Sequence, residues 1–309
     1  MRSEDSVFIL SKDDKTSDQV AAYIASSGLK FIKADKEKCE RQYPVSLLLQ
    51  NLKTAKGIWL WSDDFSDFRS KSLKTKDISR EKRMLNEYIH FIAEHHKKCL
   101  GSLMKEFYHN RLIDIEKAKS LELKAPMTFI ISKKAELSEI LHIHPDKTFI
   151  TKAMWNHNTF LIDDKKYAGG FPQTININDL NKIEVEHFFP SLIQEYIEKE
   201  FELRIFYLNG DFYTMAIFSQ RDEQTKFDFR NYNRAKPNRN VPFTLPGIIK
   251  EKLNSFMHAL QLNTGSIDMI YSKTGEFVFL EVNPVGQFGW VSENCNYYIE
   301  RKIAHYLSN

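Results

Sequence analysis

Three oxygen-bearing side chains near the end of the chain interrupt apolar strands. Glu281 and Asn283 follow the apolar run 277–280 and are two positions apart, so on a β-strand both side chains point to one face. Asp268 lies within a second apolar strand, and a hairpin turn around 273–276 would place it beside the other two. Such an all-oxygen set suits Mg²⁺, which is often held by few protein ligands together with substrate phosphates.

An acid at a strand edge and an Asn-Pro turn are common in strands that bind nothing. The combined pattern is nevertheless informative, because Asp on one strand and Glu-x-Asn on the next resembles the metal-binding end of ATP-grasp carboxylate–amine ligases. The continuation Pro284-Val285-Gly286-Gln287-Phe288-Gly289 is more specific. It resembles the ATP-grasp enzymes that crosslink ribosomally made peptides, the graspetide synthetases, and among them the peptide maturases of grasp-with-spasm clusters.

The composition of the 309-residue chain narrows the classes of function. It is 42% hydrophobic and 28% charged, which is enough for a large core divided among two or three subdomains. With 44 basic and 41 acidic residues and no concentrated basic or aromatic segment, nucleic acid is not an expected partner. The three cysteines lie far apart without metal-ligand spacing, which indicates a reduced, cytoplasmic protein. No signal peptide or membrane span is expected.

The expected fold class is α/β (α+β), with the ATP-grasp fold in three subdomains. Residues 1–109 would form a small N-terminal pre-grasp α/β domain, and residues 110–190 a central subdomain with the lid. Residues 191–309 would form a C-terminal subdomain with an antiparallel sheet and the metal site. The sequence Asn209-Gly210 between two strand-like runs supports that sheet, because it is a strong hairpin signal.

Local signals give further expectations within these domains. Ser17 is a candidate N-cap of the first helix, and residues 80–97 have the apolar spacing of a long helix. Residues 155–170 are polar and stand where ATP-grasp enzymes have a flexible lid loop. The sequence has no GxGxxG or GxxxxGK[ST] motif, so a nucleotide would not be held by a Rossmann or P-loop cradle.

The resemblance implies a set of ATP-binding residues. Arg111 and Lys152 would contact phosphates, and backbone groups of a hinge would read the adenine edge. From the residues alone, Arg111 could instead cap its helix or pair with Asp114, and Lys152 could extend from a strand edge to solvent. The nucleotide-binding positions implied by the resemblance are Arg111, Lys152, Gln194, Glu195, Tyr196, Ile197 and Glu202.

The resemblance also implies residues that act on the peptide. Arg204 would reach the transferred phosphate or the substrate carboxylate, and Glu202, on the same strand face, would orient Arg204 or touch the ribose. The alternative is a surface ion pair of little energetic value. In the sequence Asp228-Phe229-Arg230, Arg230 would hold the acceptor carboxylate, and Asp228 would orient Arg230 or accept a proton from the attacking group.

The implied reaction uses ATP and Mg²⁺ to activate an Asp or Glu side chain of a precursor peptide, with leader and core, as an acyl phosphate. A Ser, Thr or Lys side chain of the same peptide then closes an ester or amide ring. One alternative is an ATP-grasp ligase that adds a free amino acid to a protein or small acid, and another is a non-catalytic peptide-binding protein. Family analogy implies a homodimer.

Overall fold

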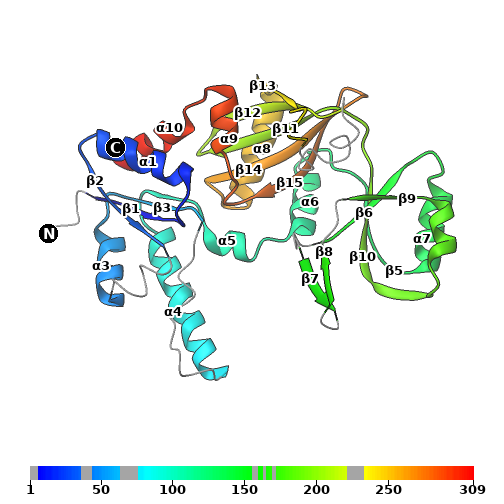
Figure 1. Cartoon of the computed structure of the whole chain (residues 1–309), viewed down its shortest axis with the longest axis horizontal. Coiled ribbons are helices and arrows are strands. Elements are labelled where there is room, and N and C mark those ends of the chain that lie inside the picture. Colours follow the sequence, from blue (N-terminus) through cyan, green and yellow to red (C-terminus); the bar gives the residue numbers. More distant parts are fainter. Residues whose placement is uncertain are drawn as a thin grey trace.

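The computed structural model describes residues 6–35, 44–62, 76–154, 159–162, 165–168, 172–220 and 233–309. Its first unit is a parallel sheet with strand order β2-β1-β3-β4 (Figure 1). All residues of β1 and β3 are buried, as expected where helices cover both faces of a parallel sheet. The elements are β1 (Ser6–Leu10), α1 (Lys15–Ser26), β2 (Lys30–Ala34), α3 (Val45–Thr54), β3 (Gly57–Leu60), α4 (Lys76–Glu94) and β4 (Cys99–Leu100).

The two faces of this sheet belong to different cores. Phe8 and Leu10 pack with buried residues of α3 and α4. Val7 and Ile9 point the other way, into a core shared with α1 and with the two C-terminal helices, α9 (Gly289–Cys295) and α10 (Ile299–Ser308). The end of the chain therefore covers the beginning, and Figure 1 shows α10 beside α1. The short helix α9 was not predicted from the sequence.

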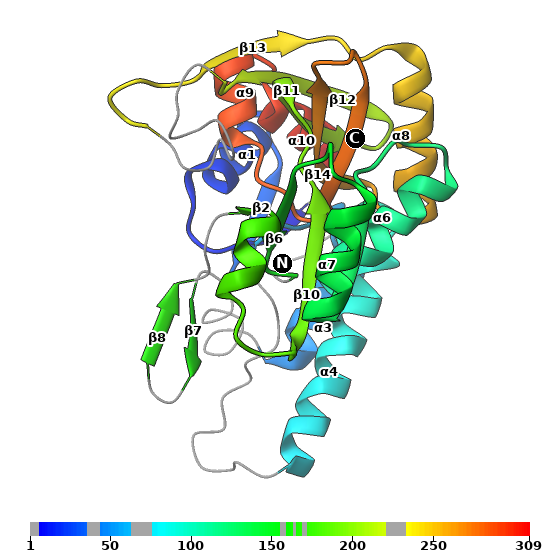
Figure 2. The same cartoon turned by 90° about the vertical axis from the view of Figure 1, so that its right-hand side faces the viewer.

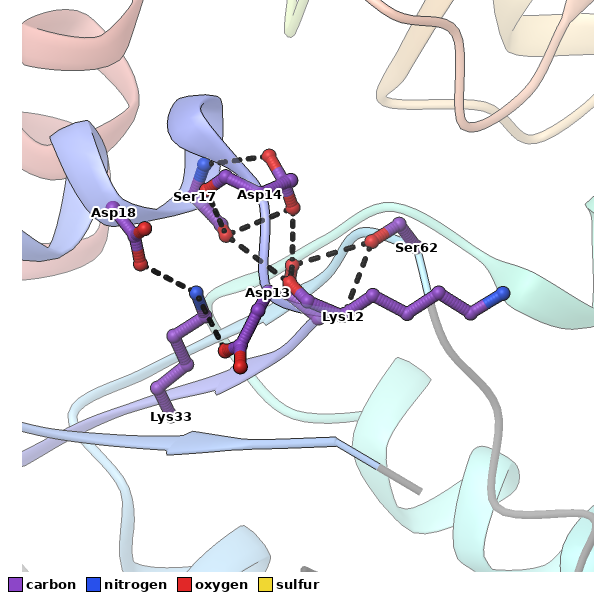
Figure 3. Close-up of polar contacts among 8 residues, drawn as sticks. Lys12, Asp13, Asp14, Ser17, Asp18, Lys33 and Ser62 are labelled. Carbon is purple, nitrogen blue, oxygen red and sulfur yellow. Dashed lines mark hydrogen bonds and ion pairs between the residues drawn. The ribbon is translucent and has the colours of Figure 1, made fainter. Parts of the chain in front are cut away.

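Helix α1 begins at a polar network between the ends of β1 and β3 (Figure 3). Asp14 is the N-cap and accepts hydrogen bonds from the Ser17 N–H at 2.9 Å and from the Ser11 hydroxyl at 2.7 Å. The prediction that Ser17 caps the helix is wrong, because Ser17 lies in the first turn and donates to Asp14. Burial alone would raise the pKa of Asp14, but hydrogen bonds from Ser17, Ser11 and Trp61 outweigh burial and hold this pKa below its ordinary value.

Two helices, α5 (Leu103–Phe107) and α6 (Arg111–Ser120), lead to a second sheet with strand order β5-β10-β6-β9. Helix α7 packs Leu137, Ile140 and Leu141 against it, beside Phe149. The further elements are β5 (Thr128–Lys133), α7 (Lys134–Ile143), β6 (Phe149–Lys152), β9 (Gln173–Ile175), the 3₁₀ helix η2 (Ile177–Lys182) and β10 (His187–Glu195).

Part of the predicted lid loop is a hairpin. Strands β7 (Thr159–Ile162) and β8 (Lys165–Ala168) pair antiparallel and form a sheet of their own. In Figures 1 and 2 the hairpin projects from the body of the molecule on the side of β6. The prediction of a loop is therefore wrong over these two segments, where the apolar residues of β7 supply strand propensity.

The C-terminal sheet is antiparallel, as predicted, with strand order β13-β12-β11-β14-β15. Side chains of β11 alternate between its faces: Leu203 and Ile205 pack with helix α8, whereas Phe206 and Leu208 join the core shared with α9 and α10. The elements are β11 (Lys199–Leu208), β12 (Asp211–Phe218), β13 (Arg239–Phe243), α8 (Gly247–Ala259), β14 (Thr264–Ser272) and β15 (Phe277–Asn283).

The predicted hairpin at Asn209-Gly210 joins β11 and β12, and both turn residues have positive φ, 47° and 102°. The expected combination of an N-terminal α/β unit with an antiparallel C-terminal sheet is confirmed. The domain limits at 109/110 and 190/191 stay a prediction, and β10 continues past the second limit as a strand of the central sheet. Among the segments described, no helix has both the length and the apolar character needed to cross a membrane.

Candidate functional site

A cleft lies between the central and C-terminal sheets. Its apolar wall includes Ile150, Leu203, Met269 and Leu280, and charged side chains surround that wall. An apolar pocket with a few converging polar groups is the usual form of a small-molecule site. The sequence-predicted residues that line the cleft are Arg111, Lys152, Gln194, Glu195, Tyr196, Ile197, Glu202, Asp268 and Glu281.

Four charged residues form a row beside this cleft. Arg204 on β11 faces Asp268 on β14 in the strand register, and Asp268 faces Glu281 on β15. The Arg204 Nη1 group donates to both oxygens of Asp268 at 2.9 and 2.8 Å. At the other end, the Nε group of Arg111, the first residue of α6, lies 2.8 Å from an oxygen of Glu281. We call Arg204, Asp268, Glu281 and Arg111 the charge row.

The charge row answers two alternatives that the sequence left open. Arg111 neither caps α6 nor pairs with Asp114: the Asn110 side chain is the cap, and Asp114 pairs with His109. Arg204 does form a cross-strand ion pair, but its partner is Asp268 and both side chains are at most 15% exposed. Such a pair is screened far less by solvent than a surface pair.

A β-bulge shapes the cleft at Glu281. The register pairs Asp268 with Glu281 but Met269 with Phe279, so Leu280 is the extra residue on β15. Neighbouring residues on a regular strand point to opposite faces, yet Leu280 and Glu281 both line the cleft. A bulge re-aims side chains in this way and is frequent beside active sites. The sequence pattern gave no sign of it.

The donor set fits a magnesium ion. Asp268 and Glu281 supply carboxylate oxygens from facing strands. Among the described residues, no group of three His, Cys, Asp or Glu side chains is arranged to hold a metal ion, so the protein would contribute few ligands. Mg²⁺ accepts so few protein ligands because it retains waters and binds substrate phosphates. Asn283 is opposite Ser266 in the register and, with Arg111, lines an adjoining cavity rather than the cleft itself.

The motif Val285–Gly289 connects this metal strand to the N-terminal sheet. Gly286 has φ +41°, and a Cβ atom there would lie 2.3 Å from the Ser266 nitrogen, so glycine is required by the close approach. The next carbonyl, of Gln287, accepts from Arg204 at 3.4 Å. Phe288 is fully buried and packs on Trp61 with ring centroids 5.0 Å apart. The motif thus joins the charge row to the core around β3.

The predicted hinge, residues 194–197, leaves β10 and enters β11. The Glu195 N–H donates to Met127 and the Tyr196 N–H to Thr148, each to a backbone oxygen at 2.8 Å. Within the described part of the chain, the Ile197 N–H donates to no backbone oxygen. Burial, together with the negative charges of nearby glutamates, raises the pKa of the Tyr196 phenol, which keeps it protonated at neutral pH.

Lys199 is a cleft residue that sequence reasoning missed. Its side chain is 4% exposed and pairs with Glu202, which also accepts from the Ser219 hydroxyl at 3.1 Å. Lys199 stands in the run Glu198-Lys199-Glu200, which is typical of a solvated segment. Only its position at the start of β11 buries it. The acids of the cleft now all have basic partners: Glu195 with Lys147, Glu202 with Lys199, Asp268 with Arg204 and Glu281 with Arg111.

Two predicted residues of the peptide-binding side, Asp228 and Arg230, lie outside the described residues, so their roles stay predictions. Lys152 ends β6 at the cleft wall, as its predicted phosphate contact requires. Gln194 is buried and its amide donates to the Thr128 hydroxyl at 3.0 Å, while the Glu195 carboxylate accepts from the Met127 N–H at 3.3 Å. These two side chains therefore stabilise the hinge.

No protein-family model and no curated protein sequence matches the chain. Solved structures do. The chain is similar to the macrocyclase MdnC from Microcystis aeruginosa bound with precursor peptide MdnA, with TM-score 0.75 and 23% identity over 97% of this chain and 98% of that one. It is also similar to a RiPP-associated ATP-grasp ligase of Chryseobacterium gregarium in complex with ADP and a leader and core peptide, with TM-score 0.76 and 19% identity over 98% and 95% of the two chains.

A third similar structure is the ATP-grasp ligase PsnB complexed with minimal precursor, Mg and ADP, with TM-score 0.73 and 14% identity over 98% of this chain and 96% of that one. At these identities the likeness establishes the fold. The chain has the ATP-grasp fold, as the sequence predicted.

Proposed function

We propose that this ATP-grasp protein is an ATP-dependent ligase that macrocyclises a ribosomally made precursor peptide. The observation that carries the proposal is the cleft itself, which combines a hinge, basic residues and a paired Asp268 and Glu281 in one cavity. The likeness to peptide-bound ATP-grasp ligases over almost the whole of both chains supports the choice of a peptide substrate. We further propose a cytoplasmic location and, from family analogy, a homodimer.

In this proposal the nucleotide lies in the cleft with its adenine at the hinge. The Ile197 N–H is the backbone donor directed to the adenine edge, because the N–H groups of Glu195 and Tyr196 already donate within the protein. Apolar side chains such as Ile150 and Met269 pack against the ring, and Glu202 is near the ribose. Lys152 and Arg111 offset the charge of the phosphates.

Asp268, Glu281 and Asn283 would hold Mg²⁺. When bound, Mg²⁺ supplies neutralisation of the charge on the β- and γ-phosphates. The residues of the chain have the remaining task of positioning. Arg230 holds the substrate carboxylate, and Arg204 reaches the transferred phosphate or that carboxylate. A fork of guanidinium donors suits either group better than the single ammonium of a lysine.

The reaction has two steps. First, an Asp or Glu carboxylate oxygen of the peptide attacks the γ-phosphorus of ATP, and the bond to ADP breaks, which yields an acyl phosphate. Second, a Ser or Thr hydroxyl or a Lys amine of the same peptide attacks the acyl carbon. Phosphate leaves, the attacking group loses a proton that Asp228 accepts, and an ester or amide ring forms. Each ring removes one water from the peptide overall.

The test is mass spectrometry of a precursor peptide encoded beside this protein, after incubation with the protein, ATP and Mg²⁺. The expected result is loss of one or more waters that requires ATP. An unchanged peptide, with ADP released only when free amino acids are supplied, would instead establish the ligase that adds a free amino acid.

Two substitutions on one hairpin make this test specific. Glu281→Ala removes a carboxylate of the charge row and is expected to abolish both ADP release and peptide modification. Glu276→Ala is the matched control, because Glu276 is on the adjoining turn and pairs with Lys124 outside the cleft. Peptide-dependent ATP turnover that survives Glu281→Ala would contradict the proposed function.

A further inference from the structure

The charges of the charge row balance one another. It contains two carboxylates, Asp268 and Glu281, side by side on neighbouring strands, and one arginine at each end. Like charges directly opposite each other across two strands repel. Here each carboxylate is neutralised by its own guanidinium, at 2.8 Å in both pairs.

We propose that Arg111 and Arg204 occupy the metal-binding carboxylates until nucleotide arrives, so that the site accepts a divalent cation only together with nucleotide phosphates. This inference rests on the proposed function, in which Asp268 and Glu281 hold Mg²⁺ beside ATP. In the described structure, both carboxylates already have a cationic partner. A bare divalent cation would therefore bring two positive charges to a row whose net charge is zero.

The burial of the row makes this competition effective. The four side chains are between 8% and 15% exposed. Charges that are so little exposed are screened weakly by dissolved salt, so the guanidinium groups oppose an incoming cation more strongly than surface arginines would. The two arginines also come from separate elements, α6 and β11, and can therefore leave their carboxylates independently.

Nucleotide phosphates reverse the balance. Guanidinium groups bind phosphate oxygens as readily as carboxylate oxygens. Arg111 lines the cleft directly, so a phosphate chain placed there offers it a new partner. Each arginine that turns toward phosphate uncovers a carboxylate, and Asp268 and Glu281 would then be available to hold a divalent cation together with the nucleotide. In this proposal Arg111 and Arg204 are positioning residues that couple the binding of metal to the binding of nucleotide.

The experiment measures Mn²⁺ binding to the full chain by electron paramagnetic resonance, first with Mn²⁺ alone and then with ADP, against ADP and Mn²⁺ without protein. We expect no Mn²⁺ binding by the wild type without nucleotide, and binding when ADP is present. Arg111→Gln, Arg204→Gln and the double variant are expected to bind Mn²⁺ alone at least about tenfold more tightly than the wild type, a usual size for coupling between sites.

The matched control is Lys124→Gln. It also removes one positive charge and leaves a carboxylate, that of Glu276, without its partner, but at an exposed pair away from the row. Its Mn²⁺ binding is expected to equal that of the wild type. A gain in Lys124→Gln as large as that in Arg111→Gln would overturn the proposal, because net charge alone would then explain it.

The wild-type measurement decides the matter even where a variant does not fold. Mn²⁺ binding by the wild type that is equally tight with and without ADP would overturn the arginine proposal while leaving the proposed function standing. Failure of the folded wild type to bind ADP with Mn²⁺ at all would overturn the proposed function. The two failures are therefore distinct.

Discussion

The Asp14 network at the start of α1 and the charge row beside the cleft both place carboxylates next to strands, but their partners differ. Asp14 accepts hydrogen bonds mostly from residues within three positions, Ser11 and Ser17 (Figure 3). In the charge row the partners are cations from remote segments: Arg204 is 64 positions from Asp268. The first network completes a helix end, whereas the second borders a cavity.

This difference separates a structural polar cluster from a candidate site. The Asp14 carboxylate is bound by neutral donors that complete the helix N-cap, so it has no charged partner that a ligand could replace. A guanidinium group, in contrast, can exchange a carboxylate for a phosphate and remain paired with an anion. Lys33, which lies between Asp13 and Asp18 in Figure 3, belongs with the structural cluster, because both acids are mostly exposed and such pairs contribute little.

The largest expected effect tests the functional half of the comparison. Asp268→Asn keeps the size of the side chain but removes the charge, and we expect kcat/KM for peptide-dependent ATP turnover to fall by about 10³-fold, as for loss of a group that stabilises transition-state charge. Asp14→Asn, the same chemical change in the other network, is expected to leave turnover within about twofold, because Asn caps helices as well as Asp. Steady-state kinetics of both variants checks this. Equal losses of kcat/KM in the two variants would contradict the distinction between the charge row and the Asp14 network.

The next effect concerns folding rather than turnover. Lys199→Met leaves Glu202 buried without its cation, and we expect the free energy of unfolding to fall by about 3 kcal/mol. Lys273→Met, which breaks an exposed pair with Glu198 nearby, is expected to cost less than about 1 kcal/mol. Urea unfolding followed by circular dichroism measures both. A small loss in Lys199→Met would show that the cleft tolerates an unpaired glutamate.

The contrast between local and remote partners also explains which contacts could be predicted from the sequence. The sequence placed Asp268 beside Glu281 because a short turn joins their two strands, and the register confirms that they are opposite each other; they meet, however, through the bulge at Leu280, because regular alternation would have put Asp268 opposite Leu280. The arginine partners were not predicted, since Arg111 and Arg204 meet these acids only after four elements, α6, β11, β14 and β15, pack together. Ion pairs between remote segments have no local pattern.

Other omissions have similar causes. The bulge at Leu280 depends on how β15 accommodates β14, and Lys199 reads as part of a charged run until β11 buries it. The apolar spacing over residues 80–97 predicted a helix but not which of its residues are buried. Tyr88 and Phe91 on α4 are 46% and 54% exposed, because the apolar stripe of α4 is wider than the surface that it covers.

A smaller effect tests the structural half of the comparison. Asp14→Ala removes the N-cap of α1, and we expect the free energy of unfolding to fall by about 1 kcal/mol with turnover unchanged. Asp13→Ala is the neighbouring control, expected to cost less than about 0.5 kcal/mol because the Asp13 side chain is mostly exposed and Lys33 keeps its second partner, Asp18. Urea midpoints at neutral pH distinguish the two. A loss of turnover in Asp14→Ala would connect the N-terminal network to the site.

The smallest effect is a pH dependence of the free energy of unfolding that comes from the Asp14 carboxylate. Its pKa in the folded protein lies below the ordinary value of 3.8, so the ionised carboxylate adds stability that is fully present above that pH. The contribution is lost as the pH falls below 3.8 through the folded pKa. Asn cannot ionise, so the difference in unfolding free energy between the wild type and Asp14→Asn is expected to be constant from pH 7 to about 5 and then to shift against the wild type. Urea unfolding of both proteins across this range measures it. A constant difference down to pH 3 would mean that the carboxylate of Asp14 gains nothing from its hydrogen bonds.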